Sequence, residues 1–356
     1  MLKVLEEFRE ILDDIMIKTI HRRVLLYGYG YTGRFLKWYA KYYHSIEVDY
    51  VVTLDTSFSR AYDLELFQNT VLGFGYKDVS DTIVWVAEPM NEPLAMFLEE
   101  RGFVANKTYF DFYAAIYGKD VSWGDPDEKD IFKMRKTGKR DIQFLEYLEW
   151  KYDCNFLQVI EKEDFEVAGE HGSAFHTTTQ KELFPILDRC HIIPGEKDAI
   201  FDYGCGKGGA MVSFLDYGFK RVGGVEYEPK IYNILEDNMT KLALDGSEGC
   251  SIECIQGDAA KVDEQLDKYN WFYFFNPFDD TIFKQCIDAI CVSLNRRNRK
   301  IHIIYNTPFC HKYLEESGYF RLMNQFTVEM RQRVVSVYEN YNNQQQCKEG
   351  KSCVCV

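Results

Sequence analysis

Three acidic residues follow short apolar runs in the second half of this 356-residue chain, and the first of them opens a glycine-rich turn. Asp202 begins the sequence Asp-Tyr-Gly-Cys-Gly-Lys-Gly, whereas Glu226 and Asp258 end the next two apolar runs. Glycine is required where a backbone turns sharply and lets a ligand approach closely. A carboxylate at a strand end can accept hydrogen bonds from both hydroxyls of a ribose, and another can reach an adenine amino group. The pattern therefore predicts a site for a ligand that contains a nucleoside.

A parallel sheet closed by a hairpin is expected to position these acids. Short apolar runs that alternate with helical stretches indicate a doubly wound parallel sheet. We predict its strands at residues 199–204, 221–227, 251–258, 271–276 and 300–306. Two further strands, 320–328 and 333–341, are joined by so short a link that they must pair antiparallel, because a parallel crossover needs about a dozen residues. The three acids would then line one crevice at the carboxyl edge of the sheet.

This arrangement resembles the class I S-adenosylmethionine-dependent methyltransferase family, over about half of the chain. That family has an acid and alternating glycines after its first strand, an acid at the end of its second, an acid after its third, and a closing hairpin. The resemblance implies S-adenosyl-L-methionine as the cofactor, with no metal and no covalent intermediate. It assigns the methionine part and the turn to Asp202, Gly204, Gly206 and Gly208, the ribose to Glu226, and the adenine to Asp258 with the adjoining Ala259.

The fourth apolar run ends in Asn276-Pro277-Phe278. Amino-group methyltransferases of the family carry an Asn/Asp-Pro-Pro-Tyr/Phe motif here, whose Asn and following carbonyl accept the acceptor's N–H bonds. The second Pro is absent from this chain, so that match is partial. A related set of small methyltransferases with Gly-Lys-Gly in the turn carries Asn-Pro-Phe and is more similar. The resemblance implies that Asn276, Pro277 and Phe278 are catalytic; a turn without a catalytic role is the alternative.

A hydroxyl acceptor would in addition need a general base. His176, Asp279 and His302 are the candidates, and the sequence alone does not rank them. The segment 175–179 precedes the first strand of this half, at the point where the family often closes over its cofactor. We expect this segment to border the cofactor site.

A second glycine turn, with Gly28, Gly30 and Gly33, lies near the start of the chain. It follows an apolar run and opens a predicted helix at about 32–43, which is the context of a dinucleotide-binding turn. Asp55 ends the next predicted strand, where an acid that binds a ribose belongs. This half resembles Rossmann-like domains that bind NAD or nucleotide sugars, so these four residues form a candidate second nucleotide site. No residue set for hydride transfer is visible, which favours an accessory role.

Composition narrows the class of protein. The net charge of −14 disfavours nucleic acid as a partner, because phosphate binding rests on clustered Lys and Arg. No apolar run has the length of a membrane-spanning helix, and the first residues do not resemble a signal peptide. Eleven scattered Cys without a CxxC pair are typical of reduced thiols in a cytoplasmic protein. We therefore expect a cytoplasmic protein with no membrane partner.

The predicted architecture is α/β, with two doubly wound Rossmann-like domains. We expect an N-terminal Rossmann-like accessory domain at 1–120, a helical linker at 121–170, and a methyltransferase domain with a seven-stranded sheet and terminal antiparallel hairpin at 171–356. The leading hypothesis is methyl transfer to a nitrogen or hydroxyl of a small-molecule or glycan-linked acceptor. One alternative is an NAD-dependent oxidoreductase or nucleotide-sugar-binding protein that uses the N-terminal turn. Another is a non-catalytic nucleotide-binding or scaffolding protein.

Overall fold

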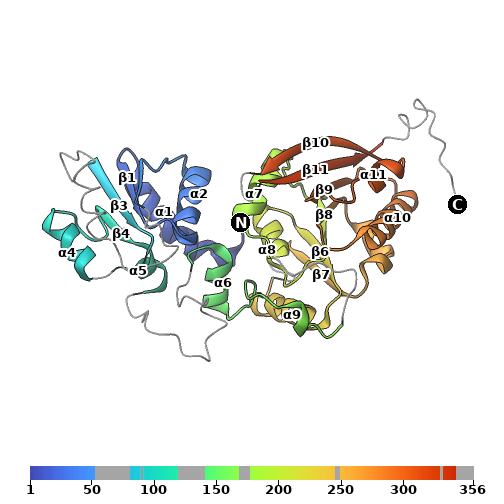
Figure 1. The fold of residues 1–356 in the computed structure, drawn as a ribbon, viewed down its shortest axis with the longest axis horizontal. Helices are drawn as coiled ribbons and strands as arrows, with labels where there is room; N and C mark the ends of the chain where they lie inside the picture. Colours follow the sequence, from blue (N-terminus) through green and yellow to red (C-terminus); the bar gives the residue numbers. More distant parts are fainter. Residues whose placement is uncertain are drawn as a thin grey trace. The chain divides into compact units, whose positions relative to one another are not determined.

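Two compact units make up the chain, Lys3–Trp150 and Lys151–Val356 with Met1–Leu2. The computed structural model describes residues 1–52, 81–88, 90, 92–118, 141–167, 177–244, 249–328 and 332–341, and both units are drawn in Figure 1. The domain boundaries expected at 120 and 170 fall in 119–140 and 168–176, outside the described residues. Within the described ranges, no helix is both long and apolar enough to cross a membrane.

The first unit contains a four-stranded parallel sheet. Its elements are η1 (Lys3–Leu5), α1 (Glu6–Thr19), β1 (Arg23–Tyr27), α2 (Tyr31–His44), β2 (Tyr50–Val52), β3 (Thr82–Val86), α4 (Glu92–Glu100), β4 (Tyr109–Asp111), α5 (Phe112–Tyr117) and α6 (Phe144–Tyr152). The strand order is β2-β1-β3-β4. Because β2 and β3 pair on opposite sides of β1, the strand order reverses between β1 and β3. Ligands of doubly wound sheets bind at the carboxyl edge of such a reversal, which is where the N-terminal glycine turn lies.

Helices pack on both faces of this sheet. On one face Leu94 and Phe97 of α4 join the apolar core formed by β1 and β3. On the other face the Trp85 indole Nε1 of β3 donates to the Thr19 hydroxyl of α1 at 3.2 Å, and its ring packs edge-on against Phe112 of α5. The sheet is therefore doubly wound, as predicted.

The second unit contains the predicted seven-stranded sheet. Its elements are η4 (Lys162–Asp164), α7 (Gln180–Arg189), β5 (Ala199–Tyr203), α8 (Gly209–Tyr217), β6 (Arg221–Glu226), α9 (Pro229–Leu242), β7 (Ser251–Gln256), η6 (Ala259–Lys261), η7 (Glu264–Lys268), β8 (Trp271–Phe275), α10 (Asp280–Arg296), β9 (His302–Asn306), α11 (Lys312–Glu316), β10 (Phe320–Val328) and β11 (Arg333–Asn340). The strand order is β10-β11-β9-β8-β5-β6-β7. β5 to β9 are parallel, and β11 runs antiparallel to both β9 and β10. This is a methyltransferase-like topology, so the fold predicted for this half is confirmed.

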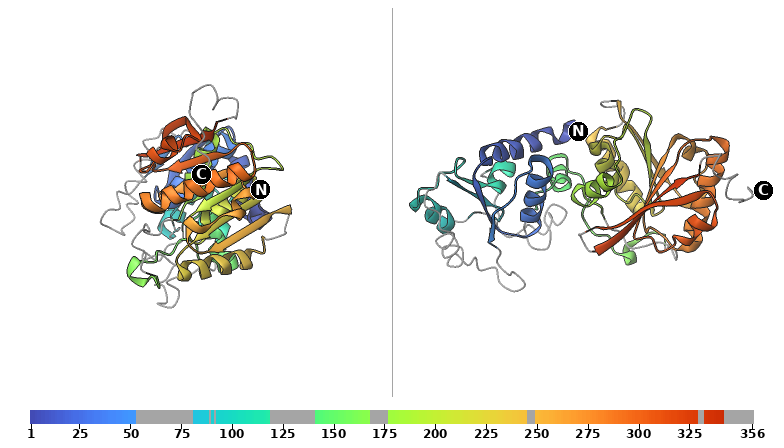
Figure 2. Two further views of the ribbon diagram at one scale, coloured as in Figure 1. Left: turned by 90° about the vertical axis from the view of Figure 1, so that its right-hand side faces the viewer. Right: turned by 90° about the horizontal axis from the view of Figure 1, so that it is seen from above.

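Alternate residues of β5 face the two layers of helices that Figure 2 shows on either side of this sheet. Phe201 and Tyr203 belong to the apolar core that includes Phe283 and Ile287 of α10. Asp202 lies between them in sequence, and successive side chains of a strand point to opposite faces. Its carboxyl group therefore lies on the opposite face, the face on which α8 packs.

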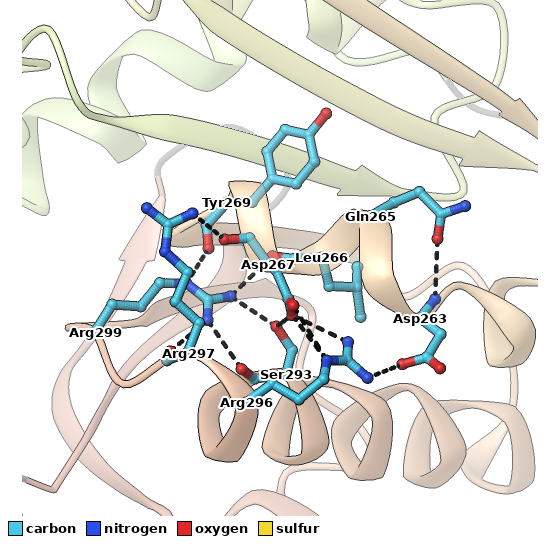
Figure 3. A network of polar contacts seen from close by, with 9 residues as sticks. All are labelled: Asp263, Gln265, Leu266, Asp267, Tyr269, Ser293, Arg296, Arg297 and Arg299. Carbon is cyan, nitrogen blue, oxygen red and sulfur yellow. Dashed lines mark hydrogen bonds and ion pairs between the residues drawn. The ribbon is translucent and has the colours of Figure 1, made fainter.

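Three arginines lie near the amino ends of β8 and β9, and Figure 3 shows their polar contacts. Arg296 pairs with Asp263 and Asp267, and Arg297 donates to the Asp267 carbonyl oxygen. The Arg299 guanidinium donates to η7 and the residue that follows it, and to the end of α10. These arginines are engaged inside the unit, so this basic run does not form an open phosphate-binding strip.

We expect Arg299→Met to lower the free energy of unfolding of this unit by about 1–3 kcal/mol, the cost of a buried carbonyl group that is left without a donor. This cost applies to Tyr269, because the Leu266 carbonyl oxygen also accepts the Tyr269 N–H at 3.0 Å. The half-buried guanidinium donates to the carbonyl oxygens of Tyr269 and Leu266 at 2.7 and 2.8 Å. Burial also lowers the pKa of Arg299 to about 10. Native-state hydrogen exchange of the β8 amides measures the change. Arg297→Met, which removes one exposed contact, is the control; equal losses in both variants would contradict the assignment.

Candidate functional site

The turn between β5 and α8 depends on its glycines. Gly204, Gly206 and Gly208 have positive φ angles of 75°, 56° and 88°, which side-chain-bearing residues rarely adopt. A Cβ atom built on Gly204 would lie 2.5 Å from the Cβ of Pro277, and one on Gly208 would overlap the side chain of Met239. The turn therefore brings the end of β5 into direct contact with the residues that follow β8.

Glu226, at the end of β6, holds this turn. One carboxylate oxygen accepts the Gly206 N–H at 3.0 Å and the other accepts the Glu228 N–H at 2.9 Å. Burial raises the pKa of Glu226, and these backbone N–H groups act in the opposite direction. Each carboxylate oxygen has room for a further donor. Glu226 can thus shape the turn and still accept hydrogen bonds from ribose hydroxyls.

Asp202 is a buried carboxyl group that faces the same edge. The residue is 3% exposed, and its carboxyl group accepts no hydrogen bond from the residues that the structure describes. Burial raises the pKa of Asp202 to about 8, and the nearby Glu226 carboxylate adds to the shift. Buried polar groups in proteins are almost always hydrogen-bonded, so a carboxyl without a partner at a strand end indicates a ligand-binding position.

Two polar residues that the sequence did not single out continue this face of the sheet. Tyr273 of β8 pairs in register with Asp202, and Asn306 ends β9. The Asn306 amide donates to the Tyr273 hydroxyl at 3.3 Å, and both side chains are buried. Asn306 was detectable, because it is a polar residue at a predicted strand end. Tyr273 was not, since an aromatic residue inside a strand is typical of core packing.

Asp258 lies at the same edge, beyond β7. Glu226 pairs in register with Gln256, two residues before it. The Asp258 carboxylate caps η6 by accepting the Ala260 N–H at 3.0 Å, and the adjoining Ala259 is buried. The structure thus brings the three predicted acids to the ends of three neighbouring strands, in the order that the sequence predicted.

The Asn276-Pro277-Phe278 segment lies beside the glycine turn. Asn276 has a positive φ of 42°, a conformation that Asn tolerates better than most residues, and Pro277 packs against Gly204. The Phe278 ring packs edge-on against Tyr203 at 6.5 Å between ring centroids. Pro277 and Phe278 therefore anchor the segment, and Asn276 directly follows β8 beside the glycine turn.

The three candidate bases lie in different places. His176 is outside the described residues. Asp279 caps α10 by accepting the N–H groups of Thr281 and Ile282. His302 begins β9 at the amino edge, where it stacks on Trp271 and burial lowers its pKa to about 4. The structure does not bring His302 to the three acids, because the first residue of a parallel strand lies at the opposite edge of the sheet.

We expect Glu226→Gln to weaken S-adenosylmethionine binding about 10- to 100-fold, the equivalent of one charge-assisted hydrogen bond. Glutamine keeps the shape of the side chain, but its NH2 group cannot accept the N–H of Gly206 or Glu228. Isothermal titration calorimetry on the folded variant measures the loss. Glu236→Gln, at an exposed position of α9, is the matched control. Unchanged affinity in Glu226→Gln would remove this residue from the site.

The N-terminal glycine turn is occupied by a side chain of its own unit. Gly28 has a φ of 93°, and a Cβ built there would overlap the side chain of Glu88, which follows β3. A glutamate oxygen also lies 3.4 Å from a Cβ built on Gly30, and Gly33 lies against the Gly28 carbonyl. A pyrophosphate would approach this turn at the start of α2, where the Glu88 carboxylate would repel it. Asp55 lies outside the described residues.

Comparisons with known proteins add little to this geometry. No protein-family model matches the chain, and no curated protein matches it. Similar solved structures include an RNA methyltransferase from Salinibacter ruber in complex with S-adenosyl-L-homocysteine (13% identity, 47% of this chain and 95% of that chain, TM-score 0.35). A ribosomal protein L11 methylase from Lactobacillus delbrueckii subsp. bulgaricus is another (16% identity, 46% and 79%, TM-score 0.33). The fold is assigned from the strand order β10-β11-β9-β8-β5-β6-β7. Across the described residues, no cluster of His, Cys, Asp and Glu could hold a metal ion.

Proposed function

We propose that the unit Lys151–Val356 transfers a methyl group from S-adenosylmethionine to a nitrogen or hydroxyl of a small-molecule or glycan-linked acceptor. The observation that carries the proposal is the set of three acids at neighbouring strand ends beside the turn of positive-φ glycines. Glu226 would hold the ribose, Asp258 and Ala259 the adenine, and Asp202 with the turn the methionine part. The buried Asp202 carboxyl, which has no partner in the described residues, supports this fit.

S-adenosylmethionine, when bound, supplies a methyl group on a sulfonium, which needs no further activation. The protein's task is therefore to align the acceptor and exclude water. Asn276 would align the acceptor; its position directly after β8, next to the Gly204 turn, supports this role. The N-terminal unit would take no part in methyl transfer and would act as an accessory domain that recognises the acceptor.

Ligand-dependent melting tests the proposed cofactor. A ligand at 100 times its dissociation constant stabilises the folded state by about 2.7 kcal/mol. We expect S-adenosylmethionine and S-adenosylhomocysteine to raise the melting temperature of this unit and NAD to leave it unchanged. Stabilisation by NAD alone would favour an oxidoreductase. A screen for transfer of a tritiated methyl group to candidate acceptors then identifies the substrate.

The affinity for S-adenosylmethionine should rise with pH by up to about tenfold per unit between about pH 6 and pH 8, and then level off. Below its raised pKa of about 8, Asp202 carries a proton in the free protein. A cationic ligand favours the ionised carboxylate, so binding releases that proton, and a reaction that releases a proton is strengthened as pH rises. Calorimetry in buffers of different ionisation enthalpy measures the release. Asp202→Asn should show a flat profile; an affinity that falls with pH would contradict this role.

A further inference from the structure

Lys207, inside the glycine turn, is almost completely buried, with 1% of its side chain exposed. Lysine is rarely buried to this degree without partners. Its ammonium group donates to the Asn155 side-chain oxygen at 2.8 Å and to the Gln158 carbonyl oxygen at 2.6 Å. Both partners belong to residues 153–167, which we call the strap. Lys207 therefore joins the turn to a segment about fifty residues earlier in the chain.

The strap runs along α9, beside which it lies in Figure 1. At one end, Lys241 near the last turn of α9 donates to the Asp153 carbonyl oxygen at 2.7 Å. Further along, the fully buried Asn238 accepts the Asn155 N–H at 2.7 Å and donates to the carbonyl oxygens of Asn155 and Lys207, both at 3.0 Å. Asn238 thus ties the strap, α9 and the turn together at one point.

The other end of the strap is held by Glu228, the residue that caps α9. Its buried carboxylate accepts the N–H groups of Glu166 and Val167 at 2.7 and 3.1 Å. The backbone N–H of the same Glu228 donates to Glu226 at 2.9 Å. At the Asn155 end of the strap, Lys207 directly follows Gly206, whose N–H also donates to Glu226, at 3.0 Å. Two of the residues that hold the strap, Lys207 and Glu228, therefore lie at or next to a backbone N–H that donates to the Glu226 carboxylate.

We infer that Lys207 is a positioning residue for the cofactor site: it fastens the strap to the turn and thereby fixes the Glu226 carboxylate for the ribose. The inference rests on the proposed function for the identity of the ligand. Its structural half, that Lys207 orders the strap, does not depend on any ligand. Lys207 and Glu228 both bind the strap, and the N–H groups of Glu228 and of Gly206 both donate to the Glu226 carboxylate. The order of the strap and the orientation of Glu226 are therefore coupled.

Lys207→Met tests both halves, because methionine keeps the apolar stem and removes the donor. Without ligand, hydrogen exchange at the amides of Asn155, Glu166 and Val167 should become at least about tenfold faster, the scale of one lost charge-assisted hydrogen bond. The dissociation constant for S-adenosylmethionine should rise by a similar factor. In protein that already carries Glu226→Gln, Lys207→Met should change the dissociation constant about threefold or less, because Lys207 affects binding through the position of Glu226. Lys284→Met, at an exposed position of α10, is the control.

The outcomes separate the two claims. Exchange in Lys207→Met equal to that of Lys284→Met overturns the fastening role. An affinity loss of the same size with and without Glu226→Gln overturns the path through Glu226. If the wild type binds no S-adenosylmethionine, the proposed function fails, and the exchange experiment still decides whether Lys207 orders the strap. Should Lys207→Met not fold, Asn155→Ala removes the acceptor of its hydrogen bond and leaves the turn unchanged, with the same expected results.

Discussion

Gly204→Ala should lower the affinity for S-adenosylmethionine at least about 100-fold, equivalent to about 2.7 kcal/mol. Two effects favour a rearranged turn that no longer fits the cofactor: a side chain at a φ of 75°, which costs about 1–2 kcal/mol, and the collision of the new Cβ with Pro277. Relieving the collision would separate the turn from the segment after β8. Calorimetry on protein whose circular dichroism is unchanged measures the loss.

A matched control is available for this substitution. Gly318 has a nearly equal φ of 70°, but a Cβ built there meets nothing within 4 Å. Gly318→Ala therefore carries the same backbone strain without the collision and should bind the cofactor like the wild type. If both variants bind equally well, close packing of the turn against Pro277 is not needed for the site.

Asn276→Ala should keep the cofactor affinity and lose about 100-fold or more in turnover, the scale of a small misplacement of reacting groups. An interaction that aligns the acceptor stabilises the transition state far more than it contributes to cofactor binding. Because Asn276 has a positive φ, alanine adds backbone strain there. Asn276→Gly removes the amide without that strain and should show the same loss.

Single-turnover methyl transfer at saturating cofactor measures this effect once an acceptor is known. Asn295→Ala, in the last turn of α10, is the control and should turn over normally. Wild-type rates in Asn276→Gly would mean that the Asn-Pro-Phe segment is only a turn. The acceptor would then bind elsewhere along the carboxyl edge of the sheet.

The sequence predicted the second unit well because its signals are local. Each glycine of the DxGxGxG turn has the positive φ that its residue type suggested, and the acids stand at strand ends that the apolar runs marked. The hairpin followed from the shortness of the link between two strands. His302 shows the limit of residue type alone, since its place at the start of β9, rather than its chemistry, excludes it from the site.

The contacts that hold the strap to the glycine turn join residues far apart in the sequence, which the sequence did not reveal. Lys207 was visible in the turn, but its partner Asn155 lies about fifty residues away, and no spacing rule connects them. The role of Glu228 as the cap of α9 could have been predicted, because an acid before Pro229 is typical of a helix start. The position of Glu88 in the first unit could not be predicted either, because the GxGxxG spacing does not indicate which side chain will lie on the turn.

A crystal structure with S-adenosyl-L-homocysteine tests the central claim most directly. We predict the ligand at the carboxyl edge of β5, β6 and β7, with its ribose hydroxyls within hydrogen-bond distance of Glu226, its adenine beside Asp258, and its amino acid part next to Asp202 and the turn. Density for the ligand at the Gly28 turn of the first unit, or none at Glu226 with ligand in saturating excess, would contradict the account.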